Sequence, residues 1–185
     1  MKVLFFICYS MIYIGIDASL RSTGITIIEE KQTSFYIITR KATKNQKSSP
    51  HYTVLEYRDI TGDLTTSLYN YIDCLRSLVK SKICARYDEV TVALEAPILA
   101  GNSRCLVDFG ILSGFIRCMI HDLGIKLIVV NNMTWKKELL GNGGADKDLT
   151  CYYFKALQPQ FKSNTTKEIN DIADSFFIAQ YARQE

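Results

Sequence analysis

The chain has 185 residues, of which 48% are hydrophobic and 22% charged, and its formal net charge is +3 at pH 7. These values are ordinary for a globular protein, and the length fits a single domain with a full-sized core. The charge is too small to establish a nucleic-acid partner, so the arrangement of the basic residues matters more. No apolar stretch approaches the roughly 20 residues that a membrane-spanning helix needs, so no membrane association is expected.

The six cysteines are scattered, without a CxxC pair or a histidine at ligand spacing (Cys8, Cys74, Cys84, Cys105, Cys118 and Cys151). A zinc site is therefore not expected. Free thiols indicate a reducing compartment, and we expect a cytoplasmic protein, in the host cytoplasm if the chain is viral. Residues 1–10 resemble the start of a secretory signal, but no small-residue cleavage site follows. We interpret them as an N-terminal extension and expect the domain to span residues 11–185.

Two short apolar runs, residues 12–16 and 25–28, flank a turn of small residues that contains Gly24 and predict a β-hairpin. The first run leads directly into Asp17. Burial disfavours the charged form of an aspartate that has no partner. Asp17 therefore either caps the turn or holds a cation.

Residues 34–39 and 52–57 predict two further short strands, separated by an exposed loop. The surrounding segment 31–58 is rich in basic residues, which only Glu56 opposes (Lys31, Arg40, Lys41, Lys44, Lys47 and Arg58). Such an excess is typical of a solvated face, and it would also suit a phosphate backbone.

Apolar residues at helical spacing predict an amphipathic helix over residues 63–82. A strand rich in β-branched residues is predicted over residues 89–96, with Glu95 near its carboxyl end. Glu95 thus lies at the carboxyl end of an apolar strand, as Asp17 does in the hairpin.

The mostly apolar stretch 103–123 predicts a helix with Gly110 and Gly114 four residues apart. Small residues at this spacing let another element approach closely, so the helix packs either in the core or at a subunit interface. Gly124 is suited to end it.

Residues 126–131 predict a buried strand, and the glycine-rich loop 141–147 follows. The N–H groups of such a loop can hold a phosphate, but the loop lacks P-loop spacing, so no nucleotide cofactor is expected. Helices are predicted from residue 147 or 148 to residue 157, and over residues 167–183. Strands followed by alternating strands and helices indicate an α/β domain, a mixed sheet covered by helices.

The last predicted helix carries Asp171 and Asp174, three residues apart and therefore on one face. Taken alone, the pair would suit a solvated helix face. Together with Asp17 and Glu95, however, it makes four acids at positions where burial is expected. Grouped carboxylates repel one another, and hard oxygen ligands favour Mg²⁺ or Mn²⁺. We therefore predict a site for two metal ions, of the kind that hydrolyses phosphodiesters.

Four blocks of the sequence resemble the motif blocks of the RuvC-type Holliday junction resolvases, in the same order and at similar separations. They are IGIDASLRSTGITII, VALEAP, WKKELLGNGGADK and NDIADSFFIA, within residues 11–182. The resemblance implies a single RNase H-like domain with a mixed five-stranded sheet flanked by helices. It also implies a homodimer that binds four-way or other branched DNA and resolves four-way junctions by paired nicks with 5′-phosphate ends. A phage or viral relative is a plausible origin.

The resemblance places four residues on the family's metal-binding carboxylates, which hold two Mg²⁺ ions, or Mn²⁺ in their place (Asp17, Glu95, Asp171 and Asp174). Lys136 and Lys147 match the two important basic positions, and Lys147 is expected to act in catalysis. The expected DNA contacts come from the third block (Lys136, Lys137, Lys147, Asn142 and Gly143). One departure is Ile98, where cellular bacterial members carry an aromatic residue that can stack on a base. Cleavage-sequence preference is expected to differ accordingly.

Three alternatives follow from the same residues. The first block also resembles the phosphate hairpin of sugar kinases and actin-like ATPases, but those proteins need two such domains and do not predict the acidic helix face. A catalytically idle junction-binding protein is disfavoured because all four carboxylates are present. A nuclease of the same fold that cuts forks, flaps or other branched DNA is the main alternative.

Overall fold

The computed structural model describes residues 11–30, 32–42, 47–57, 64–83, 89–97 and 103–185. Two sequence predictions lie outside these ranges, namely the status of residues 1–10 and the departure at Ile98. Among the helices that are described, none is long and apolar enough to cross a membrane.

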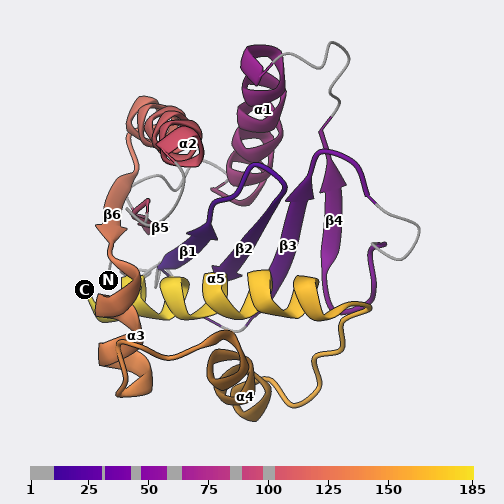
Figure 1. The fold of residues 1–185 in the computed structure, drawn as a ribbon, viewed down its shortest axis with the longest axis vertical. Coiled ribbons are helices and arrows are strands. Elements are labelled where there is room, and N and C mark those ends of the chain that lie inside the picture. The colour runs from indigo at the N-terminus through magenta and orange to yellow at the C-terminus, as the bar shows by residue number, and fades with distance from the viewer. Residues whose placement is uncertain (1–10, 31, 43–46, 58–63, 84–88, 98–102) are drawn as a thin grey trace, which may run out of the picture.

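A mixed sheet of six strands, in the order β4-β3-β2-β1-β5-β6, forms the centre of the fold (Figure 1). The strands are β1 (Ile12–Asp17), β2 (Ser22–Ile28), β3 (Thr33–Thr39), β4 (Thr53–Glu56), β5 (Val90–Glu95) and β6 (Lys126–Val130). β1, β2 and β3 pair antiparallel, whereas the β1–β5, β5–β6 and β3–β4 pairs are parallel. The predicted fold class is confirmed. The sheet has six strands instead of five because the short β4 pairs with the edge of β3.

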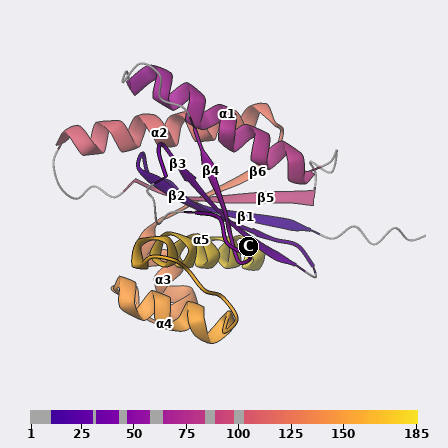
Figure 2. The same cartoon turned by 90° about the vertical axis from the view of Figure 1, so that its right-hand side faces the viewer.

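Helices cover both faces of this sheet in a three-layer arrangement (Figure 2). They are α1 (Leu64–Ile83), α2 (Ser103–Asp122), α3 (Asn132–Leu140), α4 (Lys147–Leu157) and α5 (Thr166–Gln184). α1 and α2 lie on one face, and α5 lies on the other with α3 and α4 beneath it. All were predicted except α3, whose apolar residues lack a clear helical period. Its ends are nevertheless marked, since the Asn131 side chain accepts from the Met133 amide and Gly141 adopts a left-handed conformation.

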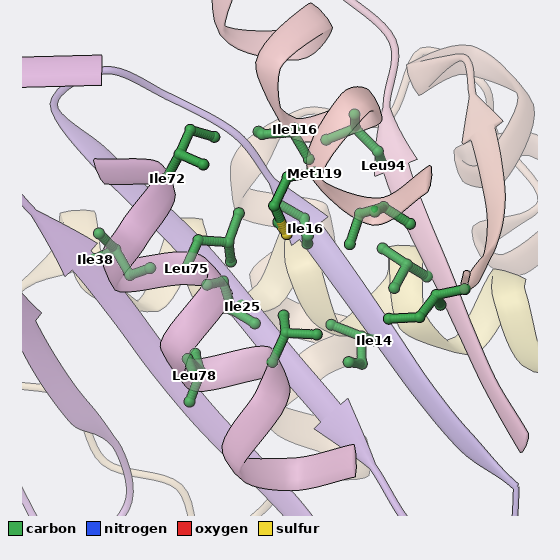
Figure 3. Packing of buried hydrophobic residues seen from close by; sticks show 14 of the residues in the cluster. Ile14, Ile16, Ile25, Ile38, Ile72, Leu75, Leu78, Leu94, Ile116 and Met119 are labelled. Atoms are coloured by element: carbon green, nitrogen blue, oxygen red, sulfur yellow. The ribbon is translucent and has the colours of Figure 1, made fainter. Parts of the chain in front are cut away.

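One hydrophobic cluster fills the space between the sheet and helices α1 and α2 (Figure 3). Ile14, Ile16 and Ile25 of the β1–β2 hairpin are fully buried in it, together with Leu75 of α1. Because these residues alternate along their strands, the opposite face of the hairpin is left to α5. The hairpin is therefore enclosed from both sides, which fixes the position of Asp17 at its inner end.

Helix α5 lies directly on the backbone of β1 and β2. A Cβ atom on Gly15 would lie 2.1 Å from the carbonyl oxygen of Ser175, and one on Gly24 would lie 1.9 Å from that of Asp171. Both distances are far below van der Waals contact, so these two positions admit glycine alone without a shift of the helix. The close approach brings Asp171 and the following turn of α5 to the strand that ends in Asp17.

We expect Gly24→Ala to lower the free energy of unfolding by ~3 kcal/mol, because the added methyl group would push α5 away from β2. Gly144→Ala is the matched control. A Cβ atom at Gly144 would meet only Oδ1 of Asn142, at the ordinary contact distance of 3.5 Å, so we expect a change of less than ~0.5 kcal/mol. Urea denaturation followed by circular dichroism measures both. Equal stability of Gly24→Ala and the unsubstituted protein would contradict the close packing.

Candidate active site

Three of the four predicted carboxylates line one cavity of about 590 Å³. Asp17 ends β1 and Glu95 ends β5, and the two strands are parallel neighbours, so both acids lie at the same edge of the sheet. Asp171 reaches the cavity from α5, which packs on the face of the sheet opposite α1 and α2 (Figure 2). Asp174 does not line the cavity, but it lies one turn further along α5 and its charge acts on Asp17. The structure thus brings all four acids into one electrostatic cluster.

Burial and repulsion by neighbouring acids raise the pKa values of three of these acids. Burial raises the pKa of Asp17 well above its usual range, and the charges of Asp174, Glu95 and Asp171 raise it further. Burial, followed by the charge of Glu95, raises the pKa of Asp174 to about 6. The pKa of Asp171 is also raised by burial, although the hydrogen bond from Ser22 opposes this. The cluster therefore favours protons or cations that neutralise it.

Hydrogen bonds from neighbouring side chains orient two of the carboxylates. The Ser22 hydroxyl donates to Oδ2 of Asp171 at 2.5 Å. Glu95 Oε1 accepts from Nδ2 of Asn132 at 2.6 Å and from the indole Nε1 of Trp135 at 3.0 Å. Trp135 is fully buried, and its ring stacks on Phe177 with a centroid distance of 6.2 Å. The unpredicted helix α3 therefore supplies both donors that hold Glu95 at the end of β5.

Cations line the same cavity as the acids. Lys147, at the start of α4, lies in its wall, and Arg21 and Lys167 lie there as well. Burial raises the pKa values of Asp17 and Asp171. The positive charge of Lys147 opposes the rise at Asp17, and that of Lys167 opposes the rise at Asp171. A cavity that combines carboxylates with exposed basic side chains can hold a phosphodiester against bound cations.

The remaining predicted DNA contacts lie around the glycine-rich loop. Lys136 is buried and its Nζ donates to the carbonyl oxygen of Ala145 at 2.8 Å, so it supports the loop from within. Asn142 is exposed, but its Oδ1 accepts from the Gly144 amide at 2.9 Å. Lys137 is exposed on α3, and Gly143 packs against the carbonyl oxygen of Met133 from that helix. Lys137 and Asn142 therefore face solvent, whereas Lys136 does not.

The donor set is chemically suited to Mg²⁺ or Mn²⁺ because it consists of carboxylate oxygens held close to one another. As placed in the described part of the chain, however, no three His, Cys, Asp or Glu side chains already converge on one point that could hold a metal ion. The ligands would therefore have to draw together around an ion. The raised pKa values of Asp17 and Asp174 provide a physical reason, since a bound cation relieves their mutual repulsion.

Five further residues of the site were not singled out by sequence reasoning (Ser22, Asn132, Trp135, Arg21 and Lys167). Ser22, Arg21 and Trp135 belong to motif blocks, which is the only signal that could have identified them. Their contacts join residues far apart in sequence, such as Ser22 and Asp171, which are 149 positions apart. No local period encodes such a contact.

The solved structures that share this fold include two of RuvC. The chain superposes on the structure of Thermus thermophilus RuvC with a TM-score of 0.61 and 16% sequence identity, covering 94% of this chain and 96% of that one. It superposes on T. thermophilus RuvC in complex with a Holliday junction substrate with a TM-score of 0.65 and 15% identity, at the same coverage. No protein-family model matches the sequence, and no curated protein matches it. The domain therefore has the RNase H-like fold of RuvC.

The raised pKa values predict a pH-dependent stability. A carboxyl group whose pKa rises from 3.8 to about 6 on folding binds more protons in the folded state, so stability falls as pH rises through this range. We expect Asp174→Asn to raise the melting temperature of the metal-free protein by a few degrees at about pH 7.5, and by much less near pH 4.5. Thermal denaturation in the presence of EDTA measures both.

The exposed aspartate at the end of α2 provides the control for that experiment. Asp122→Asn should leave the pH dependence of the melting temperature unchanged, because the Asp122 side chain is 71% exposed. In the unsubstituted protein, Mg²⁺ should raise the melting temperature mainly at the higher pH, where the carboxylates are ionised. A melting temperature of Asp174→Asn that followed that of the unsubstituted protein at every pH would contradict the cluster.

Proposed function

We propose that this protein is a metal-dependent endodeoxyribonuclease that resolves four-way DNA junctions by paired symmetric nicks. The observation that carries the proposal is the cavity in which Asp17, Glu95 and Asp171 meet the basic side chain of Lys147. The RuvC-like fold around this cavity supports it, and one of the similar structures is a RuvC bound to a Holliday junction substrate. The protein would act in the cytoplasm, or in the cytoplasm of the host cell if the chain is viral.

Two Mg²⁺ ions, or Mn²⁺ in their place, would be held by Asp17 together with Glu95, Asp171 and Asp174. When bound, such a pair activates water and stabilises the leaving oxygen in phosphodiester hydrolysis, which leaves a 5′-phosphate end. The hydrogen bonds that Glu95 accepts from Asn132 and Trp135 would hold its carboxylate in place for this role.

The basic side chains would position the DNA backbone. Lys147 faces the cavity and would contact the scissile phosphate, where its charge offsets the charge that develops during cleavage. Lys136 would act from behind the loop, since its charge lowers the pKa of Asp174 while its Nζ holds Ala145. Lys137, Asn142 and Gly143 would contact the flanking DNA. All these contacts involve the backbone, so they give no base specificity.

We further propose that two copies of the chain associate through helix α2. Val107, Phe109 and Ile111 are 59%, 38% and 38% exposed on this helix. A Cβ atom at Gly110 or Gly114 would meet nothing within 4 Å, so a second backbone could approach closely there. A two-fold dimer would present two active sites at a fixed separation, which is how paired nicks in a symmetric junction would arise.

The decisive experiment compares Mg²⁺-dependent cleavage of a synthetic four-way junction with that of a fork, a flap and linear duplex. We expect paired nicks confined to the junction. Asp17→Asn should abolish cleavage, while junction binding is retained or becomes tighter because a negative charge facing phosphate is lost. The exposed Asp122→Asn should cut at the rate of the unsubstituted protein.

The outcomes separate the competing functions. Equal cutting of all branched DNAs would favour the broader branch nuclease, with the same acids acting on a less selective DNA platform. Junction binding without any cleavage would favour the idle binding protein. Undiminished cleavage by Asp17→Asn would contradict the assignment of the acids.

Trp135→Phe tests the positioning of Glu95. This change keeps an aromatic ring against Phe177 but removes the Nε1–H donor to Glu95. We expect the single-turnover cleavage rate to fall roughly 10–100-fold and the Mg²⁺ concentration for half-maximal rate to rise, with junction affinity unchanged. Met133→Ala, on the exposed side of the same helix, is the control and should alter neither quantity. A rate loss that additional Mg²⁺ or Mn²⁺ never reduces, alongside a lowered melting temperature, would indicate a purely structural role.

A further inference from the structure

A second cavity, of about 480 Å³, lies beside the candidate active site. The turn between β1 and β2 contributes to both cavities, and Arg21 of this turn lines both. Leu20 of the same turn also lines the second cavity. The rest of it comes from the end of β3 and the two residues after it, from the residue after β4 and from helix α1 (Thr39, Arg40, Lys41, Tyr57 and Ser67). None of the roles proposed above uses these residues.

The side chains that line this second cavity give it a positive charge. Arg21, Arg40 and Lys41 are exposed there, and no carboxylate is among the lining residues that the structure describes. Three cations around one hollow favour a multiply charged or extended anion.

Hydrogen bonds fix the backbone that forms the cavity. The Thr39 hydroxyl donates to the carbonyl oxygen of Arg21 at 3.1 Å, and the Tyr57 hydroxyl donates to that of Leu20 at 2.9 Å. Both bonds tie the turn after β1 to the neighbouring strands. The turn that follows Asp17 is therefore held at a fixed distance from Arg40 and Lys41.

A buried hydroxyl provides an independent sign of a ligand. Ser67 of α1 is 7% exposed and lines the cavity, and its Oγ has no hydrogen-bond partner in the structure as described. An unpaired buried hydroxyl is unfavourable, and water or a ligand oxygen usually satisfies it. A phosphate oxygen that entered the cavity between the cations could accept a hydrogen bond from the Ser67 hydroxyl.

We infer that this second cavity binds a non-scissile phosphate of the DNA strand whose scissile phosphate lies at the acids. The inference rests on the proposed function. A strand that crosses the turn of residues 18–22 would meet Arg21 at the boundary and then Arg40, Lys41 and Ser67. This contact gives a role to basic residues of the segment 31–58, which the metal site leaves without one.

The test measures the affinity for a four-way junction with Ca²⁺ in place of Mg²⁺, so that binding is measured separately from cleavage. We expect Arg40→Gln/Lys41→Gln to weaken affinity about tenfold and to reduce the slope of log K against log salt by about one. Lys80→Gln/Lys126→Gln is the charge-matched control, since both lysines are exposed and line neither cavity. Single-turnover cleavage at saturating protein should stay within about twofold for Lys80→Gln/Lys126→Gln. It should fall for Arg40→Gln/Lys41→Gln, because a strand that is held at one phosphate is less well positioned at the acids.

Neutral methylphosphonate linkages, placed one at a time along the strand, locate the contact. One linkage near the cleavage position should weaken binding by the unsubstituted protein and have no further effect on Arg40→Gln/Lys41→Gln. Ser67→Ala should reduce the sensitivity to the same linkage. Two results would overturn the inference. One is an equal loss of affinity at every linkage, and the other is an Arg40→Gln/Lys41→Gln protein that binds the junction as tightly as the unsubstituted protein.

This test and the test of function can fail separately. A linkage-specific effect in a protein that never cuts DNA would support the second phosphate contact and contradict the proposed nuclease function. Junction cleavage without any linkage-specific effect would leave the nuclease standing and overturn the second phosphate contact. Melting temperatures of the variants, compared with the unsubstituted protein, show that each is folded.

Discussion

The candidate site depends on one close contact, the packing of helix α5 onto the bare backbone of strands β1 and β2. Gly15 and Gly24 make this contact possible, because a side chain at either position would overlap the helix backbone. A buried hydrogen bond of 2.9 Å between the hydroxyls of Thr26 and Ser175 adds direction to the same interface. With α5 fixed along β1, its two aspartates must lie beside Asp17. The acidic cluster is thus a consequence of backbone packing.

Gathering acids next to an apolar core is unfavourable, and the surroundings offset only part of that cost. Ser22 stabilises the charged form of Asp171. The donors from α3 hold the side chain of Glu95 in place by hydrogen bonds. Asp17 is less well compensated, since burial and three neighbouring acids raise its pKa and the charge of Lys147 opposes them. The remaining imbalance is what a divalent cation would relieve. The same imbalance would help a bound cation to draw the acids together.

Local patterns in the sequence were sufficient for the hairpin, for the long helices and for the positions of the acids at strand ends. They were sufficient because periods of two and 3.6 residues report directly which side of an element is buried. The short helix α3 lacks such a period, so only Asn131 and Gly141 at its ends could have revealed it. The contacts of Trp135 with Glu95 and of Ser67 with its cavity depend on how distant elements pack, which no local pattern reports.

If the chain binds DNA as proposed, the two cavities would give the DNA backbone a direction. A site that contacts phosphates alone cannot recognise bases, so it must place the scissile phosphate by geometry. One phosphate held at Lys147 would leave the strand free to rotate about that point. A second phosphate held by Arg40 and Lys41, on the far side of the turn that carries Arg21, would remove this freedom. Because Thr39 and Tyr57 fix that turn by hydrogen bonds, the fold would set the distance between the two phosphates. The rigid turn after β1 would then determine both which phosphate meets the acids and in which direction the strand runs.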